Sequence, residues 1–402
     1  MAHSLEQIVN LCNDVTNNSK EIKKGSLFLA LPGTVFDGRN YISEAIKNGA
    51  SAIIYEKKDF KLKDQIFIPH LGIENLHKQQ AKIVKSFFTN PSKFLKIIGI
   101  TGTNGKTSVA GWLSQSLNLL NCKAGIIGTL GYEVLGKKIK TLNTTPDIIS
   151  LSNMLNNAVH EQCEFVVLEV SSHALQQKRI ENIDFDLRIL TNVSRDHLDY
   201  HKTMKSYQNT KKQFFLNEKR IKAIINIDDI VGRAIIEEGE LENHQFISYA
   251  IDRDADIKVK NIVYKNNKMI FDFFWEKKSY QIKANIYGKH NIYNLLSVIA
   301  SLLFYEFSMN KIIETIENLE GILGRNEVVH FDKNGFPQVI IDYAHTPDAL
   351  ENILKSLDET EPSEIILIFG CGGNRDKGKR KQMALVASKY ADKVIITNDN
   401  PR

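Results

Sequence analysis

Gly99-Ile100-Thr101-Gly102-Thr103-Asn104-Gly105-Lys106-Thr107-Ser108 is the stretch of sequence that decides the fold. The apolar run Leu95–Ile100 predicts a buried strand, and Val109–Leu120 has the apolar spacing of a helix. Glycines between a strand and a helix let backbone N–H groups crowd around phosphate oxygens without a Cβ clash. The start of the helix adds partial positive charge at the same place. The stretch therefore predicts a phosphate-binding loop in an α/β domain.

The loop is shorter than the usual Walker loop, which has a glycine five residues before Gly105, where Ile100 stands here. We expect Lys106 to reach the β- and γ-phosphates of a nucleotide and the Thr107 hydroxyl to bind Mg²⁺. An ordinary glycine turn is the alternative, and the Lys-Thr pair at the start of the helix argues against it.

The composition is that of a globular protein with two or three domains. The chain has 402 residues, of which 43% are hydrophobic and 25% charged. Its net charge of +5 is spread along the chain, which argues against a nucleic-acid partner. A modest positive charge suits small polyanions such as nucleotides.

The cysteines and the apolar runs favour a cytoplasmic protein. Four cysteines stand without paired spacing, as reduced thiols do: Cys12, Cys122, Cys163 and Cys371. The N-terminus has no basic-then-apolar signal pattern, and no apolar run reaches membrane-spanning length. We expect no membrane insertion.

Residues 1–90 form the first of three α/β regions. Short strands and a helix alternate here: Ser26–Leu31, Tyr41–Asn48 and Ala52–Tyr55. The turn signal Asn90-Pro91-Ser92 marks the expected boundary at residue 90.

Residues 91–325 form the second region, which contains the phosphate-binding loop. Further apolar strands are expected at Phe165–Val170, Leu187–Thr191 and Ile221–Ile227. Strands that alternate with helices predict a parallel, doubly wound sheet, whose ligands bind at the carboxyl ends of the strands. Residues 255–287 change to the period-two pattern of an antiparallel insert, and a helix over Asn291–Phe304 follows.

Residues 326–402 form the third region, again with an α/β pattern. Strands are expected at Gln338–Asp342, Ile365–Phe369 and Val394–Thr397, and helices at Pro347–Leu357 and Lys379–Tyr390. A sheet of this size should leave an apolar face or edge uncovered.

Polar side chains stand at the ends of two strands of the second region. Glu169 ends one strand, and the loop Thr191–His201 holds two histidines and two aspartates. Because Mg²⁺ prefers oxygen ligands near a phosphate, Glu169 is a candidate metal ligand. From the residues alone, a capping acid and a solvated polar turn remain open alternatives.

Three motifs now point to one family. They are Thr-Gly-Thr-Asn-Gly-Lys-Thr at 101–107, Glu-Val-Ser-Ser-His at 169–173 and Asn-Val-Ser-Arg-Asp-His-Leu-Asp-Tyr-His at 192–201. Together they resemble the motifs of the Mur ligases, the ATP-dependent amino-acid-adding enzymes of peptidoglycan synthesis. The resemblance runs from about Asn18 to Arg402.

Later motifs resemble one type within that family, the diaminopimelate-adding or MurE type. They are Asp-Tyr-Ala-His-Thr-Pro-Asp-Ala-Leu at 342–350, Phe-Gly-Cys-Gly-Gly-Asn-Arg-Asp-Lys-Gly-Lys-Arg at 369–380 and Asp-Asn-Pro-Arg at 399–402. A single motif of this kind would carry little weight, whereas six in chain order are specific.

The resemblance implies a three-domain α/β architecture and a reaction. Residues 1–90 would bind the UDP-precursor, 91–325 would form the central ATP-binding domain with its parallel sheet, and 326–402 a partial, Rossmann-like amino-acid-binding domain. ATP would phosphorylate the D-glutamyl carboxylate of UDP-N-acetylmuramoyl-L-alanyl-D-glutamate, and the amine of meso-2,6-diaminopimelate would attack the acyl phosphate. Such chemistry depends on positioning and charge neutralisation.

The resemblance also implies which residues hold ATP and Mg²⁺. Catalytic roles fall to Lys106, Lys211, Glu169 and His197. ATP would contact Gly102, Thr103, Asn104, Gly105, Lys106, Thr107, Ser108, Asn291, Arg325 and Asp342. The metal would be held by Thr107, Glu169, His197 and Lys211, the last as a carbamate, which turns a cation into an anion. By sequence alone Lys211 is a surface lysine.

Substrate contacts are implied in the same way. For the UDP-precursor they are Ser19, Thr34, Val35, Phe36, Asn143, Thr144, Thr145, Ser171, Gln177 and Arg179. For diaminopimelate they are Arg375, Asp399, Asn400, Pro401 and Arg402. The family has an acidic-Ser-Arg triplet where this chain has Asn18-Ser19-Lys20.

Other functions remain open at this point. The lysine-adding variant of the same ligase is one, and a phosphotransferase that uses the same loop is another, which the motifs at 342–350 and 399–402 disfavour. Because family members continue past Asp-Asn-Pro-Arg, we also expect a C-terminal truncation and a fragment that binds ATP and UDP-precursor with incomplete catalysis. A monomer is expected.

Overall fold

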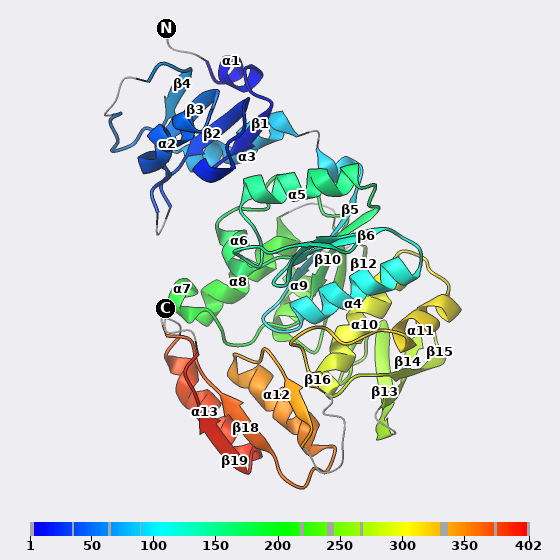
Figure 1. Cartoon of the computed structure of the whole chain (residues 1–402). Coiled ribbons are helices and arrows are strands. Elements are labelled where there is room, and N and C mark those ends of the chain that lie inside the picture. Colours follow the sequence, from blue (N-terminus) through cyan, green and yellow to red (C-terminus); the bar gives the residue numbers. More distant parts are fainter. Residues whose placement is uncertain are drawn as a thin grey trace. The chain divides into compact units, whose positions relative to one another are not determined.

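The computed structural model describes residues 4–33, 36–62, 66–88, 90–217, 221–238, 245–265, 268–329, 337–373 and 376–399. The chain divides into two compact units. The first contains residues 1–95, 145–162 and 177–184, and the second contains the remainder. Figure 1 labels the helices and strands of both units.

The first unit is built on a four-stranded parallel sheet in the order β1-β2-β3-β4. Its strands are β1 (Asp14–Thr16), β2 (Ser26–Ala30), β3 (Ala52–Glu56) and β4 (His70–Ile73), and its helices are α1 (Leu5–Asn10), α2 (Ile42–Lys47), α3 (Leu76–Phe87) and α5 (Ile148–His160). Alternate residues of β2 point to opposite faces, since Leu27 packs in the cluster with α3 and α5 and Phe28 in the cluster with α2. Ile148 and Ile149 belong to the first of these clusters, which is why α5 groups with this unit.

The second unit is built on an eleven-stranded sheet in the order β15-β14-β13-β12-β11-β10-β5-β9-β6-β7-β8. The strands from β12 to β6 in this order pair in parallel, which confirms the predicted parallel sheet. They are β5 (Lys96–Thr101), β6 (Ala124–Gly128), β9 (Phe165–Glu169), β10 (Leu187–Leu190), β11 (Lys222–Asn226) and β12 (Gln245–Ala250). Antiparallel strands extend the sheet at both ends: β7 (Gly131–Val134), β8 (Lys137–Ile139), β13 (Ile257–Lys265), β14 (Lys268–Trp275) and β15 (Lys278–Ala284). The expected antiparallel insert is therefore part of the main sheet.

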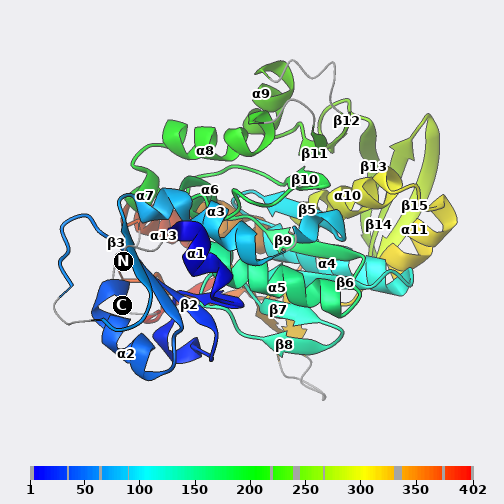
Figure 2. The ribbon, with the colours of Figure 1, turned by 90° about the horizontal axis from the view of Figure 1, so that it is seen from above.

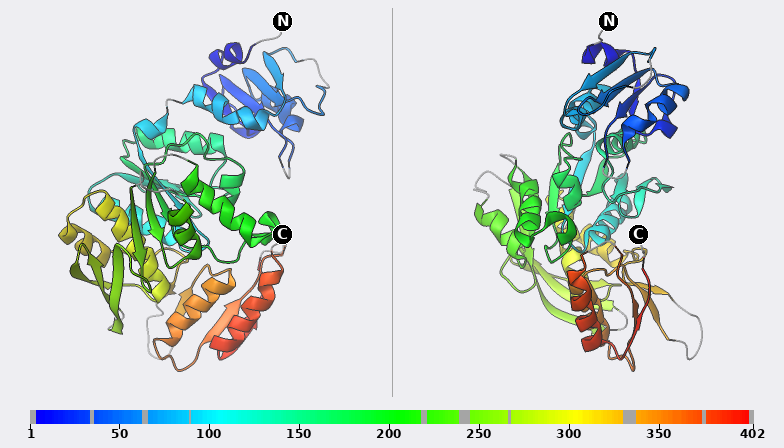
Figure 3. Two further views of the ribbon diagram at one scale, coloured as in Figure 1. Left: turned by 180° about the vertical axis from the view of Figure 1, so that it is seen from behind. Right: turned by 90° about the vertical axis from the view of Figure 1, so that its left-hand side faces the viewer.

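Helices cover both faces of the parallel strands. The helices of this part of the chain are α4 (Lys106–Leu119), α6 (Ser172–Gln176), α7 (Leu198–His201), α8 (Met204–Leu216), α9 (Ile230–Glu238), α10 (Lys289–Phe304) and α11 (Met309–Glu317), of which α6 and α7 pack on α8. Figure 2 shows α8 and α9 on one side of this sheet and α4 on the other. Figure 3 shows α11 beside the antiparallel strands, where it contacts β15.

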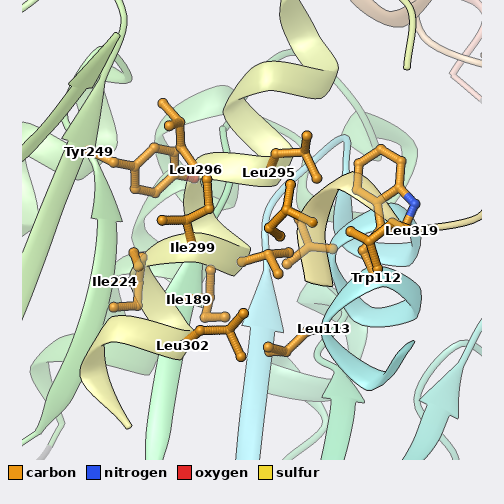
Figure 4. Close-up of a cluster of buried hydrophobic side chains, with 14 of the residues drawn as sticks. Trp112, Leu113, Ile189, Ile224, Tyr249, Leu295, Leu296, Ile299, Leu302 and Leu319 are labelled. Atoms are coloured by element: carbon orange, nitrogen blue, oxygen red, sulfur yellow. The ribbon is translucent and has the colours of Figure 1, made fainter. Parts of the chain in front are cut away.

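The largest hydrophobic cluster lies between the sheet and the helices α4 and α10. Figure 4 shows Trp112 and Leu113 of α4, Leu295 and Ile299 of α10 and Ile189 of β10 in this cluster. The helix α10 packs on α4 as well as on β11 and β12. The helix α4, which follows the phosphate-binding loop, is therefore held firmly on the sheet.

The described residues after 324 contain two small sheets and two helices. β16 (Glu327–Val329) pairs antiparallel with β17 (Val339–Ile341), and β18 (Ile366–Phe369) pairs in parallel with β19 (Lys393–Ile396). The helices α12 (Pro347–Asp358) and α13 (Gly378–Tyr390) pack on each other and match the predicted spans closely. The side chains of Ile366, Ile368 and Ile396 are exposed, as expected for a small sheet.

Candidate active site

A cavity of about 730 Å³ opens in the second unit beside the Gly102–Gly105 loop. The loop follows β5, and Glu169 ends β9, so the cavity lies at the carboxyl ends of parallel strands. The predicted residues among its lining are Gly102, Thr103, Asn104, Gly105, Lys106, Thr107, Ser108, Thr144, Glu169, Ser171, His197, Lys211, Asn291, Arg325, Asp342 and Asp399. Their roles stay predictions, although the structure brings them together.

The loop is fixed to the end of β10 by hydrogen bonds. The backbone N–H of Asn104 donates to the Asn192 side chain at 3.0 Å, and the Thr191 hydroxyl donates to the Asn104 carbonyl at 2.7 Å. Gly105 has a φ of 87°, and a Cβ there would lie 2.3 Å from the Asn294 side chain. A glycine is therefore required at the residue that starts α4.

Lys106 folds back over this loop. Its Nζ donates to the carbonyl oxygens of Gly102 at 2.9 Å and Thr103 at 2.8 Å. Burial lowers the pKa of the Lys106 amine, and the negative charges of Glu169 and Asp196 oppose that shift. Both hydrogen-bond acceptors are backbone carbonyls of the loop. Neither of these two bonds is an ion pair that the ammonium must break when it turns to a phosphate.

The Thr107 hydroxyl and the Glu169 carboxylate face each other beside the loop. Thr107 Oγ1 donates to Glu169 Oε2 at 3.0 Å and accepts from Arg325 Nη2 at 2.8 Å. Neighbouring ligands of an octahedral Mg²⁺ with bonds of 2.0–2.1 Å lie about 2.9 Å apart. The separation of the two oxygens therefore fits a single Mg²⁺. Within the described residues, no group of three or more His, Cys, Asp or Glu side chains is arranged to hold a metal.

Lys211 is buried on α8, with 1% of its surface exposed, so the interpretation as a surface lysine is wrong. Its Nζ donates to the Gly102 carbonyl at 2.7 Å and to Thr101 Oγ1 at 3.3 Å, and lies 5.0 Å from the centre of the Tyr207 ring. Burial, followed by the charge of Lys106, holds the pKa of the Lys211 amine well below its ordinary value.

Asp196 links the loop after β10 to residues after 340. Its carboxylate lies 3.3 Å from the Nε2 atoms of His197 and His345 and 3.5 Å from Lys379 Nζ. Burial alone would raise the pKa of Asp196, but the hydrogen bond to His345 and the charges of His197, His345 and Lys379 hold it well below its usual range. The carboxylate therefore stays ionised, next to the Lys379 ammonium and two imidazole rings.

Aromatic and histidine rings surround His197. Its ring contacts those of His173 and Tyr207, with centroids 4.9 and 6.2 Å apart. Burial lowers the pKa of His197 to about 3, against the opposing charge of Asp196. A neutral imidazole is the form that binds a metal, so His197 is ready to act as a ligand at neutral pH.

Polar side chains on α10 and near β17 line another wall of the cavity. Asn291 Nδ2 donates to the Tyr287 carbonyl at 2.9 Å, and the Arg325 guanidinium stacks 4.5 Å from the centre of the Tyr343 ring. Asp342 accepts from the backbone N–H groups of residues 326 and 344, each at 2.7 Å. The Asp342 carboxylate therefore orders this turn in addition to any contact with nucleotide.

Several predicted substrate residues do not line this cavity. Ser19, Phe36, Thr145, Gln177 and Arg179 belong to the first unit. There Ser19 Oγ donates to Glu44 at 3.0 Å, and Arg179 binds the Thr145 carbonyl at 2.6 Å and the Gln177 side chain.

The remaining predicted residues are only partly described. Asn143 is exposed and is not among the lining residues. Thr34, Val35, Arg375, Asn400, Pro401 and Arg402 lie outside the described residues.

The structure adds site residues that the sequence reasoning missed. Tyr207 OH lies 3.0 Å from Thr103 Oγ1, and Thr129 binds the Glu169 carboxylate through both its backbone and its hydroxyl. Asp196 is part of the motif at 192–201, whereas Thr129 belongs to none of the motifs described above. Its position follows from the pairing of β6 with β9, which places Ile127 beside Leu168.

In the part of the chain that the structure describes, no helix has the length and apolar character needed to cross a membrane.

Comparison with protein families gives three matches along the chain. The profile described as "Mur ligase family, catalytic domain" matches residues 13–95, "Mur ligase middle domain" matches residues 100–302, and "Mur ligase, glutamate ligase domain" matches residues 324–402.

Two similar proteins carry the enzyme name UDP-N-acetylmuramoyl-L-alanyl-D-glutamate–2,6-diaminopimelate ligase. The one from Coxiella burnetii is 39% identical over 401 residues, which cover 98% of this chain and 81% of the relative. The one from Wigglesworthia glossinidia brevipalpis is also 39% identical, with 97% and 80% covered. A solved structure with the same enzyme name superimposes with a TM-score of 0.72 at 28% identity, over 97% of this chain and 79% of that one.

Proposed function

The chain belongs to the Mur ligase family, whose enzymes are ATP-dependent, ADP-forming peptide ligases, and from this premise we propose its substrates. We propose that it adds meso-2,6-diaminopimelate to UDP-N-acetylmuramoyl-L-alanyl-D-glutamate in peptidoglycan synthesis. The enzyme name of relatives at 39% identity supports this choice, as do the motifs at 342–350 and 399–402. The lysine-adding variant of the ligase is the second candidate.

The proposed reaction has two steps. An oxygen of the D-glutamyl γ-carboxylate attacks the γ-phosphorus of ATP, and the bond to ADP breaks, which gives an acyl phosphate. The amine of diaminopimelate then attacks the acyl carbon, loses a proton, and phosphate leaves as the amide forms. The first step brings a carboxylate to a triphosphate and the second releases phosphate, so the site must neutralise charge and hold the reactants in line.

The cavity contains cations and polar groups suited to this task. Lys106 Nζ, now on the Gly102 and Thr103 carbonyls, would turn to the phosphates, and Arg325 lies next to Thr107 to add a second positive charge. Thr107, Glu169 and His197 would hold Mg²⁺. When bound, the metal supplies positive charge at the phosphate oxygens.

We further propose that Lys211 is carbamylated. Its amine is buried among the carbonyl of Gly102, the hydroxyl of Thr101 and the ring of Tyr207, where a full positive charge is costly. A neutral amine can react with CO₂, and the resulting carbamate would be an anionic ligand next to the nucleotide loop.

The observation that carries the proposed function is the pair Thr107 and Glu169, whose oxygens lie 3.0 Å apart at the start of α4. A glycine turn without a nucleotide would not need a buried carboxylate against the hydroxyl of the Lys-Thr pair. Both residues lie within residues 100–302, which match the Mur ligase middle domain, and this supports the proposal.

Phosphate release tests the proposal. The chain is incubated with Mg-ATP and the UDP-muramoyl dipeptide, with diaminopimelate, with lysine or with neither, and the product is identified by mass spectrometry. We expect release to depend on diaminopimelate and the amide product to appear. Preference for lysine would establish the second candidate, release without any amino acid a phosphotransferase, and binding of ATP and precursor without release a non-catalytic fragment.

A further inference from the structure

The Glu169 carboxylate is held by a turn that follows β6. Glu169 is 1% exposed. The backbone N–H of Thr129 donates to its Oε1 at 2.8 Å, and Thr129 Oγ1 donates to its Oε2 at 3.1 Å. One residue therefore contacts both oxygens of the carboxylate, and it shares Oε2 with the Thr107 hydroxyl.

The direction of each hydrogen bond in this network is fixed. An ionised carboxylate only accepts, so the hydroxyl protons of Thr129 and Thr107 both point to Glu169. Thr129 Oγ1 can then only accept from the Thr144 hydroxyl, 3.1 Å away, and Thr107 Oγ1 accepts from Arg325. The chain of donors runs inward to Glu169 from both ends.

The backbone beside Thr129 approaches the carboxylate closely on the side of its Oε1 atom. A Cβ added to Gly128 would lie 2.2 Å from Glu169 Oε1 and 2.7 Å from its carboxyl carbon. Because β6 pairs directly with β9, this close approach is built into the sheet.

We propose that Thr129 is a positioning residue, which sets the orientation of the Glu169 carboxylate toward the divalent cation that accompanies the nucleotide. This inference rests on the proposed function. Thr129 would bind no metal itself. Its hydroxyl restrains Glu169 Oε2, the oxygen that faces Thr107, and without it this oxygen can rotate away from the metal position.

Three substitutions separate the hydroxyl from the shape of the side chain. Thr129→Val removes the hydroxyl and keeps the branched shape, whereas Thr129→Ser keeps the hydroxyl. Thr141→Val is the matched control, because Thr141 Oγ1 donates to the Gly128 carbonyl of the same turn at 3.3 Å. Thr129→Ala, which adds no atoms, replaces the valine variant if valine disturbs the turn.

The measurement is binding of Mn²⁺ in the presence of a non-hydrolysable ATP analogue, followed by electron paramagnetic resonance. We expect Thr129→Val to weaken Mn²⁺ binding about 10-fold, within the range seen for residues that orient metal ligands. Thr129→Ser and Thr141→Val should bind Mn²⁺ as the parent chain does, and affinity for the analogue in EDTA should be equal in all four.

Equal Mn²⁺ affinity in the parent and in Thr129→Val or Thr129→Ala would overturn the inference, as would equal weakening in Thr129→Ser. A parent chain that binds no Mn²⁺ with the analogue would instead contradict the metal site of the proposed function. The two failures are therefore distinguishable.

Discussion

Lys106 and Lys211 donate to the same carbonyl oxygen, that of Gly102, at distances of 2.9 and 2.7 Å. Two ammonium groups on one oxygen repel each other strongly away from water. Loss of a proton from Lys211 would relieve this repulsion. Burial and the charge of Lys106 both favour that loss, because they lower the pKa of Lys211. We therefore expect different tasks for the two lysines, Lys106 as a cation for phosphate and Lys211 as an amine that gives up its proton more easily.

Lys106→Ala should lower ATP turnover by about 100-fold or more, because a triphosphate in the cavity would lose a charge-assisted hydrogen bond. The variant should keep its fold, since the ammonium contacts only loop carbonyls. Turnover is measured as ADP release, and folding by circular dichroism.

Lys205→Ala is the control for this substitution, because Lys205 is an exposed lysine of α8. It should leave turnover unchanged. Near-normal turnover in Lys106→Ala would contradict the assignment of the phosphate-binding loop.

Arg402→Ala should reduce the preference for diaminopimelate over lysine. Arg402 lies outside the described residues, and this expectation comes from the Asp-Asn-Pro-Arg motif. A guanidinium can bind the second carboxylate of diaminopimelate with two parallel hydrogen bonds, and the loss should be about 1–3 kcal/mol of selectivity.

The ratio of kcat/KM values for the two amino acids measures this selectivity in the parent and the variant. If the parent chain itself prefers lysine to diaminopimelate, the prediction is refuted.

The local signals in the sequence predicted several elements of the fold. The strand before Gly102, the helix after Thr107 and the period-two pattern of residues 255–287 each depend on neighbours in sequence, and each appears in the structure. The sequence did not predict that the antiparallel strands join the main sheet, or that Ile148 packs in the first unit. Both depend on pairing between segments far apart in the chain.

The same distinction applies to the site. The candidate roles of Lys106 and Thr107 can be predicted from spacing alone, because the strand, the glycine turn and the helix are contiguous in the sequence. From spacing alone, Lys211 cannot be distinguished from a surface lysine. Its contact with the Gly102 carbonyl depends on how α8 packs. Thr129 stands 40 residues before Glu169, and only the pairing of β6 with β9 brings them together.

Stability should fall between pH 7 and pH 5 in part because of His201. This side chain is 3% exposed, its Nε2 contacts Ser172 Oγ at 2.9 Å, and its Nδ1 has no hydrogen-bond partner within the described residues. Burial lowers the pKa of His201 to about 4 from the ordinary value of 6.5. The unfolded chain therefore binds the proton more readily between these pH values, and the free energy of unfolding falls as the pH is lowered through this range.

His201→Gln removes the titrating group and keeps a polar side chain. Its loss of unfolding free energy from pH 7 to pH 5 should be smaller than that of the parent by about 2 kcal/mol. Urea unfolding at the two pH values gives both quantities. Parallel pH profiles of the two proteins would show that His201 does not contribute.

Lys211→Ala should be inactive, and short-chain carboxylates should partly restore its activity. The substitution removes the nitrogen that would carry the carbamate and opens a space between Gly102, Thr101 and Tyr207, which a small carboxylate can enter. Its two oxygens would replace those of the carbamate as ligands. Phosphate release is measured with acetate, propionate or chloride at equal ionic strength, so that screening is the same throughout. Restoration by acetate but not by chloride is expected, and Lys205→Ala should respond to neither.

In the parent chain, bicarbonate should raise activity, and mass spectrometry under bicarbonate should show the added mass of CO₂ on Lys211. Carbamates are labile, so an unmodified lysine alone decides nothing; absence of the added mass together with failure of every carboxylate to restore activity would refute the carbamate and leave Lys211 as a neutral amine that only orders the Gly102 carbonyl.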